Sequence, residues 1–170
     1  MSLNIKYFLT LALFFSLPVL AAQADRNKPV EIEADNASFI EKNQQTEFSG
    51  NVIIKQGSLN IHASKVSARR ENDGHQYITA TGNPVRFSQD LDDKRPDGKL
   101  QKIKGHANQI TFDDKKNTII MSGNAYLDRE GDVVTGPTVT YNTVSSEYFV
   151  KGSQKGRVSV ILQPTTIKKH

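Results

Sequence analysis

A seven-residue phrase occurs twice in this chain, and it constrains the possible fold more than any other feature. Residues 48–54 read Phe-Ser-Gly-Asn-Val-Ile-Ile, and residues 121–127 read Met-Ser-Gly-Asn-Ala-Tyr-Leu. The offset of 73 residues continues without a gap between 34–68 and 107–141, where seven residues recur unchanged: Ala34, Phe39, Lys42, Ser49, Gly50, Asn51 and Val66. Such a repeat predicts two copies of one supersecondary unit, neither of which buries its apolar face alone.

Residues 1–24 have the features of a secretory signal peptide. Lys6 and the amino terminus supply a positive start, residues 7–17 are mostly apolar, and Ala-Gln-Ala at 22–24 is a small-x-small cleavage site. An uncleaved membrane anchor is the alternative, but the apolar stretch is shorter and more interrupted than the ~20 apolar residues that a spanning helix needs. We therefore predict that residues 1–24 are a cleaved signal peptide.

The remaining 146 residues, from Asp25 to His170, are enough for one domain, or for two fused small ones, with a hydrophobic core. We predict this domain at 25–164 and a flexible tail at 165–170. Cysteine is absent, which excludes disulfides and thiol chemistry. Subtracting 18 acidic residues from the 21 Lys and Arg that follow the signal peptide leaves a charge of +3. The basic residues are scattered, so nucleic-acid binding is not predicted.

Apolar residues alternate with polar ones in short runs of four to eight residues, which is the pattern of half-buried β-strands. The apolar residues that mark these runs alternate within 30–34, 46–54, 59–63, 78–80, 85–87, 110–112, 119–121, 139–141 and 158–162. Turn-forming residues separate them at 42–44, 56–58, 72–74, 82–84, 113–117, 130–132 and 153–156. The charged segment 90–99 is predicted to be a mobile surface loop that joins the two halves.

This pattern predicts an all-β fold, because no amphipathic helix is found after the signal peptide. Antiparallel strands with one inward face would curl, through their right-handed twist, into a jelly roll or an open-ended β-sandwich. Gly50 and Gly123 lie inside strand-like runs and predict a bend that is used twice. An outer-membrane barrel is the alternative, but it needs ~9–11-residue strands with aromatic girdles, whereas these runs are shorter and tryptophan is absent.

Catalytic and metal-binding patterns were not found. The histidines, His62, His75, His106 and His170, lack metal-ligand spacing, and no nucleophile elbow, phosphate loop or calcium loop occurs. An enzyme would need a convergent acid, base or nucleophile set, and no such set can be named. We predict no enzymatic activity, no cofactor and no metal.

The inward apolar stripe is the remaining candidate site. If the curled sheet is not completely filled, it forms a long trough that suits acyl chains, and each buried methylene contributes ~0.8 kcal/mol. The alternative is that the same residues simply fill a core. Unpaired strand edges at the open ends would favour strand addition by another copy or a partner. Candidate lipid-binding residues from the alternation are Phe48, Val52, Ile54, Ile61, Ile110 and Met121.

Five segments together resemble one known family. They read Pro-Val-Glu-Ile-Glu-Ala-Asp at 29–35, Phe-Ser-Gly-Asn-Val at 48–52, Gln-Gly-Ser-Leu-Asn-Ile at 56–61, Gly-His-Ala-Asn-Gln at 105–109 and Ser-Gly-Asn-Ala-Tyr-Leu at 122–127. In their order and spacing the chain is similar to the periplasmic lipopolysaccharide-transport proteins of the LptA family (the OstA-type domain). The resemblance implies a slightly twisted antiparallel β-jelly roll, open at both ends, that binds lipid A acyl chains, and its ligand positions map onto Val30, Ile32, Phe87 and Phe112.

The resemblance also implies a location and partners. A periplasmic protein of this family would carry lipopolysaccharide from the inner to the outer membrane as part of an end-to-end bridge of copies of itself. The bridge would join an inner-membrane-anchored, LptC-like partner to an outer-membrane, LptD-like translocon. The alternative function is a periplasmic structural scaffold that polymerises through strand edges without a lipid ligand.

Overall fold

The structure is a computed structural model that describes residues 25, 27–95, 97–142, 144–145, 147–153 and 156–164. The predicted signal peptide at 1–24 and tail at 165–170 lie outside these residues. A 3-10 turn, η1 (Glu41–Asn43), accompanies the strands β1 (Glu31–Glu33), β2 (Asn36–Ile40), β3 (Gln45–Gln56), β4 (Leu59–Arg70), β5 (Gln76–Lys94), β6 (Leu100–Asp113), β7 (Thr118–Arg129), β8 (Asp132–Asn142), β9 (Tyr148–Lys151) and β10 (Ser159–Ile161). Within the described part, no helix has the length and apolar character needed to span a membrane.

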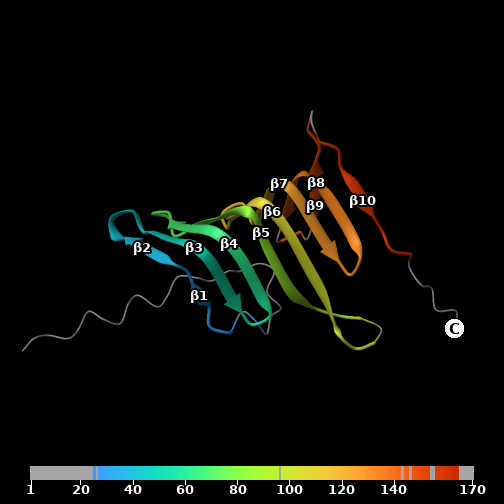
Figure 1. The fold of residues 1–170 in the computed structure, drawn as a ribbon, viewed down its shortest axis with the longest axis horizontal. Helices are drawn as coiled ribbons and strands as arrows, with labels where there is room; N and C mark the ends of the chain where they lie inside the picture. The colour runs from blue at the N-terminus through green and yellow to red at the C-terminus, as the bar shows by residue number, and fades with distance from the viewer. Residues whose placement is uncertain are drawn as a thin grey trace, which may run out of the picture.

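The strands form one twisted antiparallel sheet in which neighbours in sequence are neighbours in space. The order is β1-β3-β4-β5-β6-β7-β8-β10, while β2 also pairs with β3 and β9 also pairs with β8. Figure 1 shows the resulting progression of colour across the sheet, from blue β1 and β2 to red β10. Among the described strands, the two end groups do not pair with each other, so the sheet remains unclosed. The predicted all-β, antiparallel, open fold is confirmed.

The internal duplication is visible in the strand boundaries. Adding 73 to the bounds of β3 gives 118–129, which are the bounds of β7. The same shift moves β4 onto β8, except that β8 ends one residue earlier. Shifted in the same way, β1 and β2 fall on the two halves of β6. The first copy therefore has two short strands where the second has one continuous strand with a register shift in its middle.

The repeated Ser-Gly-Asn phrase, which was predicted to be a bend used twice, is a β-bulge in both copies. Register shifts between residues 49 and 52 in β3 and between 122 and 125 in β7. Gly50 and Gly123 have φ of 79° and 78°, in the left-handed region that glycine tolerates. Each also lies against an equivalent residue, Asp35 or Asn108, so closely that a Cβ atom would collide with it. The glycines are required by both backbone conformation and space.

Several predicted boundaries are wrong because the bulges interrupt strands without ending them. Strands β3–β8 contain 11 to 19 residues, not four to eight. Residues 82–84, predicted as a turn, lie inside β5, where the pairing with β6 shifts between Thr81 and Val85. The predicted loop at 90–99 is also wrong in its first half, since β5 continues to Lys94 and Asp90 pairs with Lys102. The apolar Leu91 packs against the core there, which explains why the charged run remains in the sheet.

The inner face of the sheet holds two clusters of buried apolar side chains. The first comprises Val52, Ile54, Val66, Ile78, Ala80, Val85 and Phe112. The second comprises Phe87, Ile103, Ala107, Met121, Ala125, Leu127 and Val139. Ile61, Ile110 and Ile119 are partly buried and pack against both clusters. The interior is therefore continuous across the central strands.

Candidate functional site

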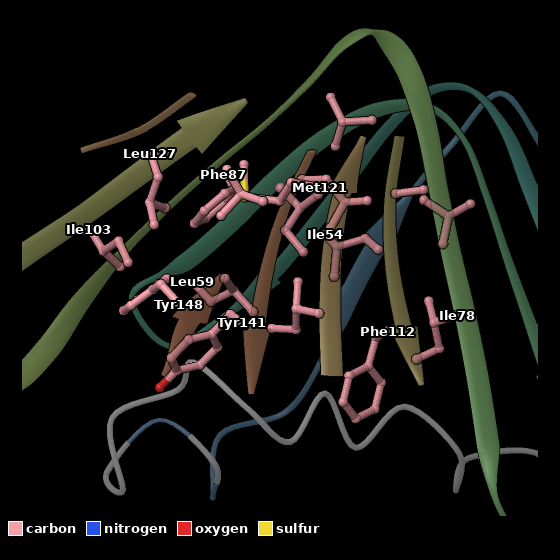
Figure 2. Close-up of a pocket in the computed structure, with 17 residues that line it drawn as sticks. Ile54, Leu59, Ile78, Phe87, Ile103, Phe112, Met121, Leu127, Tyr141 and Tyr148 are labelled. Carbon is pink, nitrogen blue, oxygen red and sulfur yellow. The ribbon is translucent and has the colours of Figure 1, made fainter. Parts of the chain in front are cut away.

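An apolar cavity lies where the two clusters meet. Its volume is about 110 Å³, and side chains from β3 to β9 line it. Figure 2 shows Phe87, Ile54 and Met121 close together in the cavity, with Leu127 and Ile103 toward one end and Phe112 and Ile78 toward the other. The lining residues are Ile54, Leu59, Ile61, Val66, Ile78, Ala80, Val85, Phe87, Ile103, Ile110, Phe112, Ile119, Met121, Leu127, Val139, Tyr141 and Tyr148.

Six of the ten residues predicted to contact lipid line this cavity: Ile54, Ile61, Phe87, Ile110, Phe112 and Met121. The other four are Val30, Ile32, Phe48 and Val52. They belong to the first cluster or pack against it, on β1, β3 and the residue before β1. All ten predicted residues are therefore on the same apolar face, but the structure places these four beside the cavity and not in its wall.

Tyr148 is the lining residue that sequence reasoning missed most completely. It begins β9, a four-residue strand that pairs with the end of β8. Its ring lies 4.5 Å from that of Tyr141. The residue is 40% exposed, and partial desolvation of its hydroxyl raises the pKa of that group. The alternation over 139–141 indicated that Tyr141 faces inward, but a strand of four residues with an exposed Phe149 carries no clear period.

The cavity is smaller than an acyl chain. An apolar cavity of ~150 Å³ is about the size needed for one benzene molecule, so about 110 Å³ holds less than a single ring. An acyl chain can therefore enter only if the lining side chains move apart. The sheet permits this movement, since the two end groups of described strands are not joined by a hydrogen-bonded ladder.

A second hollow, of about 380 Å³, lies on the opposite, outer face. Arg86, His62, His106 and Tyr126 cross it in one row, because they are register partners on adjacent strands β4–β7. The rings of His106 and Tyr126 stack with centroids 5.0 Å apart and planes only 7° from parallel. This face is polar, in contrast to the inner one.

The carboxylate of Asp128 contacts two residues that line this hollow, Lys104 and Tyr126. Asp128 accepts hydrogen bonds from the Gly131 N–H at 2.8 Å and the Tyr126 hydroxyl at 3.2 Å, and the Lys104 ammonium lies 3.3 Å away. The Gly131 N–H, followed by Lys104, holds the pKa of Asp128 below its usual range. In the residues that the structure describes, no three His, Asp or Glu side chains gather as metal ligands.

The fold and its interior define a class of protein: an unclosed, internally duplicated antiparallel sheet around an apolar space. A family model described as "LptA/(LptD N-terminal domain) LPS transport protein" matches residues 31–147. The chain is 32% identical over 156 residues to the lipopolysaccharide export system protein LptA of Escherichia coli K12. The aligned region covers 90% of this chain and 80% of that protein. The LptA of Haemophilus influenzae is 30% identical over 164 residues, covering 95% and 92% of the two chains.

A solved structure agrees with the fold. The crystal structure of LptH from Pseudomonas aeruginosa, described as the LptA-homologous periplasmic component of the lipopolysaccharide transport device, superposes with a TM-score of 0.67 at 22% identity. It covers 82% of this chain and 99% of that one. The chain belongs to the LptA family of lipopolysaccharide transport proteins, as the five sequence segments predicted. The predicted periplasmic location agrees with this relationship.

Proposed function

We propose that this protein binds lipopolysaccharide through its acyl chains in the apolar interior and carries it across the periplasm. The observation that carries the proposal is the cavity at the junction of the two clusters, whose wall is apolar apart from the two tyrosine hydroxyls. Such a wall offers acyl chains a hydrophobic contribution of ~0.8 kcal/mol for each buried methylene, and it offers little to a flat polar ligand. Membership of a lipopolysaccharide transport family supports the same ligand.

Lipid entry requires the interior to expand. The first cluster is contributed mainly by β3, β4 and β5, and the second mainly by β6, β7 and β8. Separating them exchanges contacts between side chains for contacts with acyl chains, which are equally apolar. Because the ladder between adjacent strands is retained, the expansion preserves the backbone hydrogen bonds that stabilise the sheet.

The strand edges support assembly into an end-to-end bridge. At one end, β2 pairs with β3 and its residues are exposed, including Phe39 at 53%. At the other end, β10 pairs with β8, and Val160 and Ile161 are 51% and 55% exposed. Exposed apolar edge strands favour strand addition, so copies of this chain would join through these two ends. The terminal copies would contact the LptC-like inner-membrane partner and the LptD-like outer-membrane translocon.

The second candidate is a scaffold that polymerises through the same edges and binds no lipid. The small cavity volume favours this alternative, because an interior this well filled in the free protein needs no ligand to be stable. The two functions differ in one respect only, namely whether lipid enters the interior.

Photo-crosslinking separates the two candidates. A photoreactive phenylalanine derivative at Phe112 or Tyr148, both in the cavity wall, is expected to capture lipopolysaccharide. The same derivative at Tyr126, on the outer face, is the matched control and is expected to capture none. Equal capture at all three positions, or none at the inner two, would reject the proposed lipid site.

A further inference from the structure

Gln89 is a buried amide that the folded chain does not satisfy. It lies in β5 with 2% of its surface exposed. Neither its Nε2 nor its Oε1 has a hydrogen-bond partner within the described part of the chain. A buried amide that pairs with no protein group costs free energy in the folded state unless a bound molecule completes its hydrogen bonds. Buried polar side chains are almost always paired, so an unpaired amide at this position points to a role outside the folding of the chain itself.

The position of Gln89 connects it with the apolar cavity. It is on the inner face with Phe87, two residues earlier, and its register partner across the ladder is Ile103. Phe87 and Ile103 both line the cavity. Its register therefore places Gln89 beside Ile103. Figure 2 shows Ile103 and Leu127 at one end of the cavity, away from Phe112 and Ile78.

Polar groups from the nearby β3–β4 turn do not compensate for the missing partners of Gln89. The hydroxyl of Ser58 donates to Asp25 and accepts the backbone N–H of Asp90 at 3.1 Å. The Nε2 of Gln56, another buried amide at this end, donates to the carbonyl of Lys28 at 3.1 Å. These polar groups therefore pair with one another and with the backbone, and none of the hydrogen bonds includes the amide of Gln89.

We infer that Gln89 forms a polar subsite, at which its amide donates a hydrogen bond to the carbonyl that links an acyl chain to its headgroup. This inference rests on the proposed function, since it requires acyl chains in the interior. The hydrocarbon then extends toward Phe112 and Ile78, and the acyl linkage stays near Ile103. The subsite gives the interior a direction along the strands, which an apolar wall alone does not provide.

The same subsite confers selectivity for acylated over alkylated amphiphiles. A chain attached through an ether has no carbonyl, so it excludes water from the interior and leaves the Gln89 amide unpaired. Sites built to hydrogen-bond a ligand group discriminate strongly against analogues that lack it, because a buried polar group is then left without a partner. An apolar residue at position 89 would remove this discrimination and would accept either chain equally.

Three surfactants with ten-carbon chains and sugar headgroups test this selectivity: decanoyl sucrose, decanoyl-N-methylglucamide and decyl maltoside. Only the first two contain a linkage carbonyl. Their dissociation constants are measured below the micelle-forming concentration for the wild type, Gln89→Leu and Gln89→Met. Gln109→Leu, the same chemical change at an exposed position of β6, is the control. Circular dichroism verifies that each variant keeps the β fold.

The wild type and Gln109→Leu are expected to bind both acyl surfactants about tenfold more tightly than decyl maltoside. Gln89→Leu and Gln89→Met should lose this preference and bind the three surfactants about equally. Their affinity for decyl maltoside should be no weaker than that of the wild type. A preference that survives both substitutions, or is absent from the wild type, overturns the subsite but leaves the lipid-binding interior intact. If the wild type binds none of the surfactants and no lipopolysaccharide, the proposed function fails as well.

Discussion

Substitutions of two equally buried valines can distinguish a ligand-binding interior from a filled core. Val139 on β8 and Val52 on β3 are each 1% exposed. Val139 lines the cavity, whereas Val52 packs in the first cluster and does not line it. Replacing either with alanine removes two methyl-sized groups, and hydrophobic transfer alone predicts a loss of ~1.6 kcal/mol. The space left behind brings the expected destabilisation to about 2 kcal/mol.

Lipid should reverse the effect of only one substitution. Without lipid, both variants are expected to melt about 6 °C below the wild type, because a domain of this size loses ~3 °C for each kcal/mol. In Val139→Ala the acyl chain can occupy the space of the missing methyl groups. Its affinity for lipopolysaccharide should therefore rise, by up to about tenfold, and saturating lipid should restore most of the lost melting temperature. In Val52→Ala the space is away from the chain, so the deficit should persist.

Thermal melts followed by circular dichroism measure the melting temperature of each of the two variants, without and with lipopolysaccharide. The reasoning is refuted if lipid rescues both variants equally, since the cavity would then have no special relation to the ligand. It is also refuted if lipid stabilises neither variant nor the wild type, which is the result expected of the scaffold alternative.

Three further changes follow from local geometry. Gly105→Ala should destabilise the fold by ~2 kcal/mol, because a Cβ would lie 2.6 Å from the Tyr126 carbonyl oxygen and 2.7 Å from the Phe87 ring. Denaturant titrations measure this loss, and an unchanged unfolding midpoint would contradict it. The depressed pKa of Asp128 contributes stability above about pH 4 that is lost as pH falls through its folded-state pKa. The melting-temperature deficit of Asp128→Asn should therefore shrink below about pH 4, and a deficit that is constant to pH 2 argues against that assignment. Val160→Lys on the exposed edge strand β10 should reduce end-to-end association in analytical ultracentrifugation without lowering the melting temperature, and undiminished association would exclude β10 from the contact.

The all-β class was predictable because apolar and polar residues alternate with a period of two in each main strand. This period can be read from the order of the residues alone. It also located the bulges at Gly50 and Gly123, since a glycine that recurs inside an apolar alternation usually marks a bulge or a bend. Strand length was not predictable in the same way. At residues 82–84 the Gly-Asn-Pro phrase has the composition of a turn, yet β5 passes through it, because strands on both sides continue the ladder around the irregularity.

The candidate site was predictable as a face but not as a cavity. Alternation placed Val30, Ile32 and Val52 inward, and each does contact the core. It did not indicate that Tyr148 would complete the wall, because that contact depends on how β9 returns along β8. Nor did it identify Gln89, since a glutamine flanked by Ser88 and Asp90 looks like part of a polar segment until its burial is known.

The central claim, that acyl chains occupy the apolar interior, can be tested at one atom. The sequence contains two methionines, Met1 and Met121, so a chain beginning at Asp25 keeps only Met121. Met121 is 4% exposed and lines the cavity. With its methyl group labelled with ¹³C, nuclear Overhauser effects between this methyl and acyl-chain protons are expected when lipopolysaccharide is added. A Met121 signal that neither shifts nor shows such effects at saturating lipid would contradict the account.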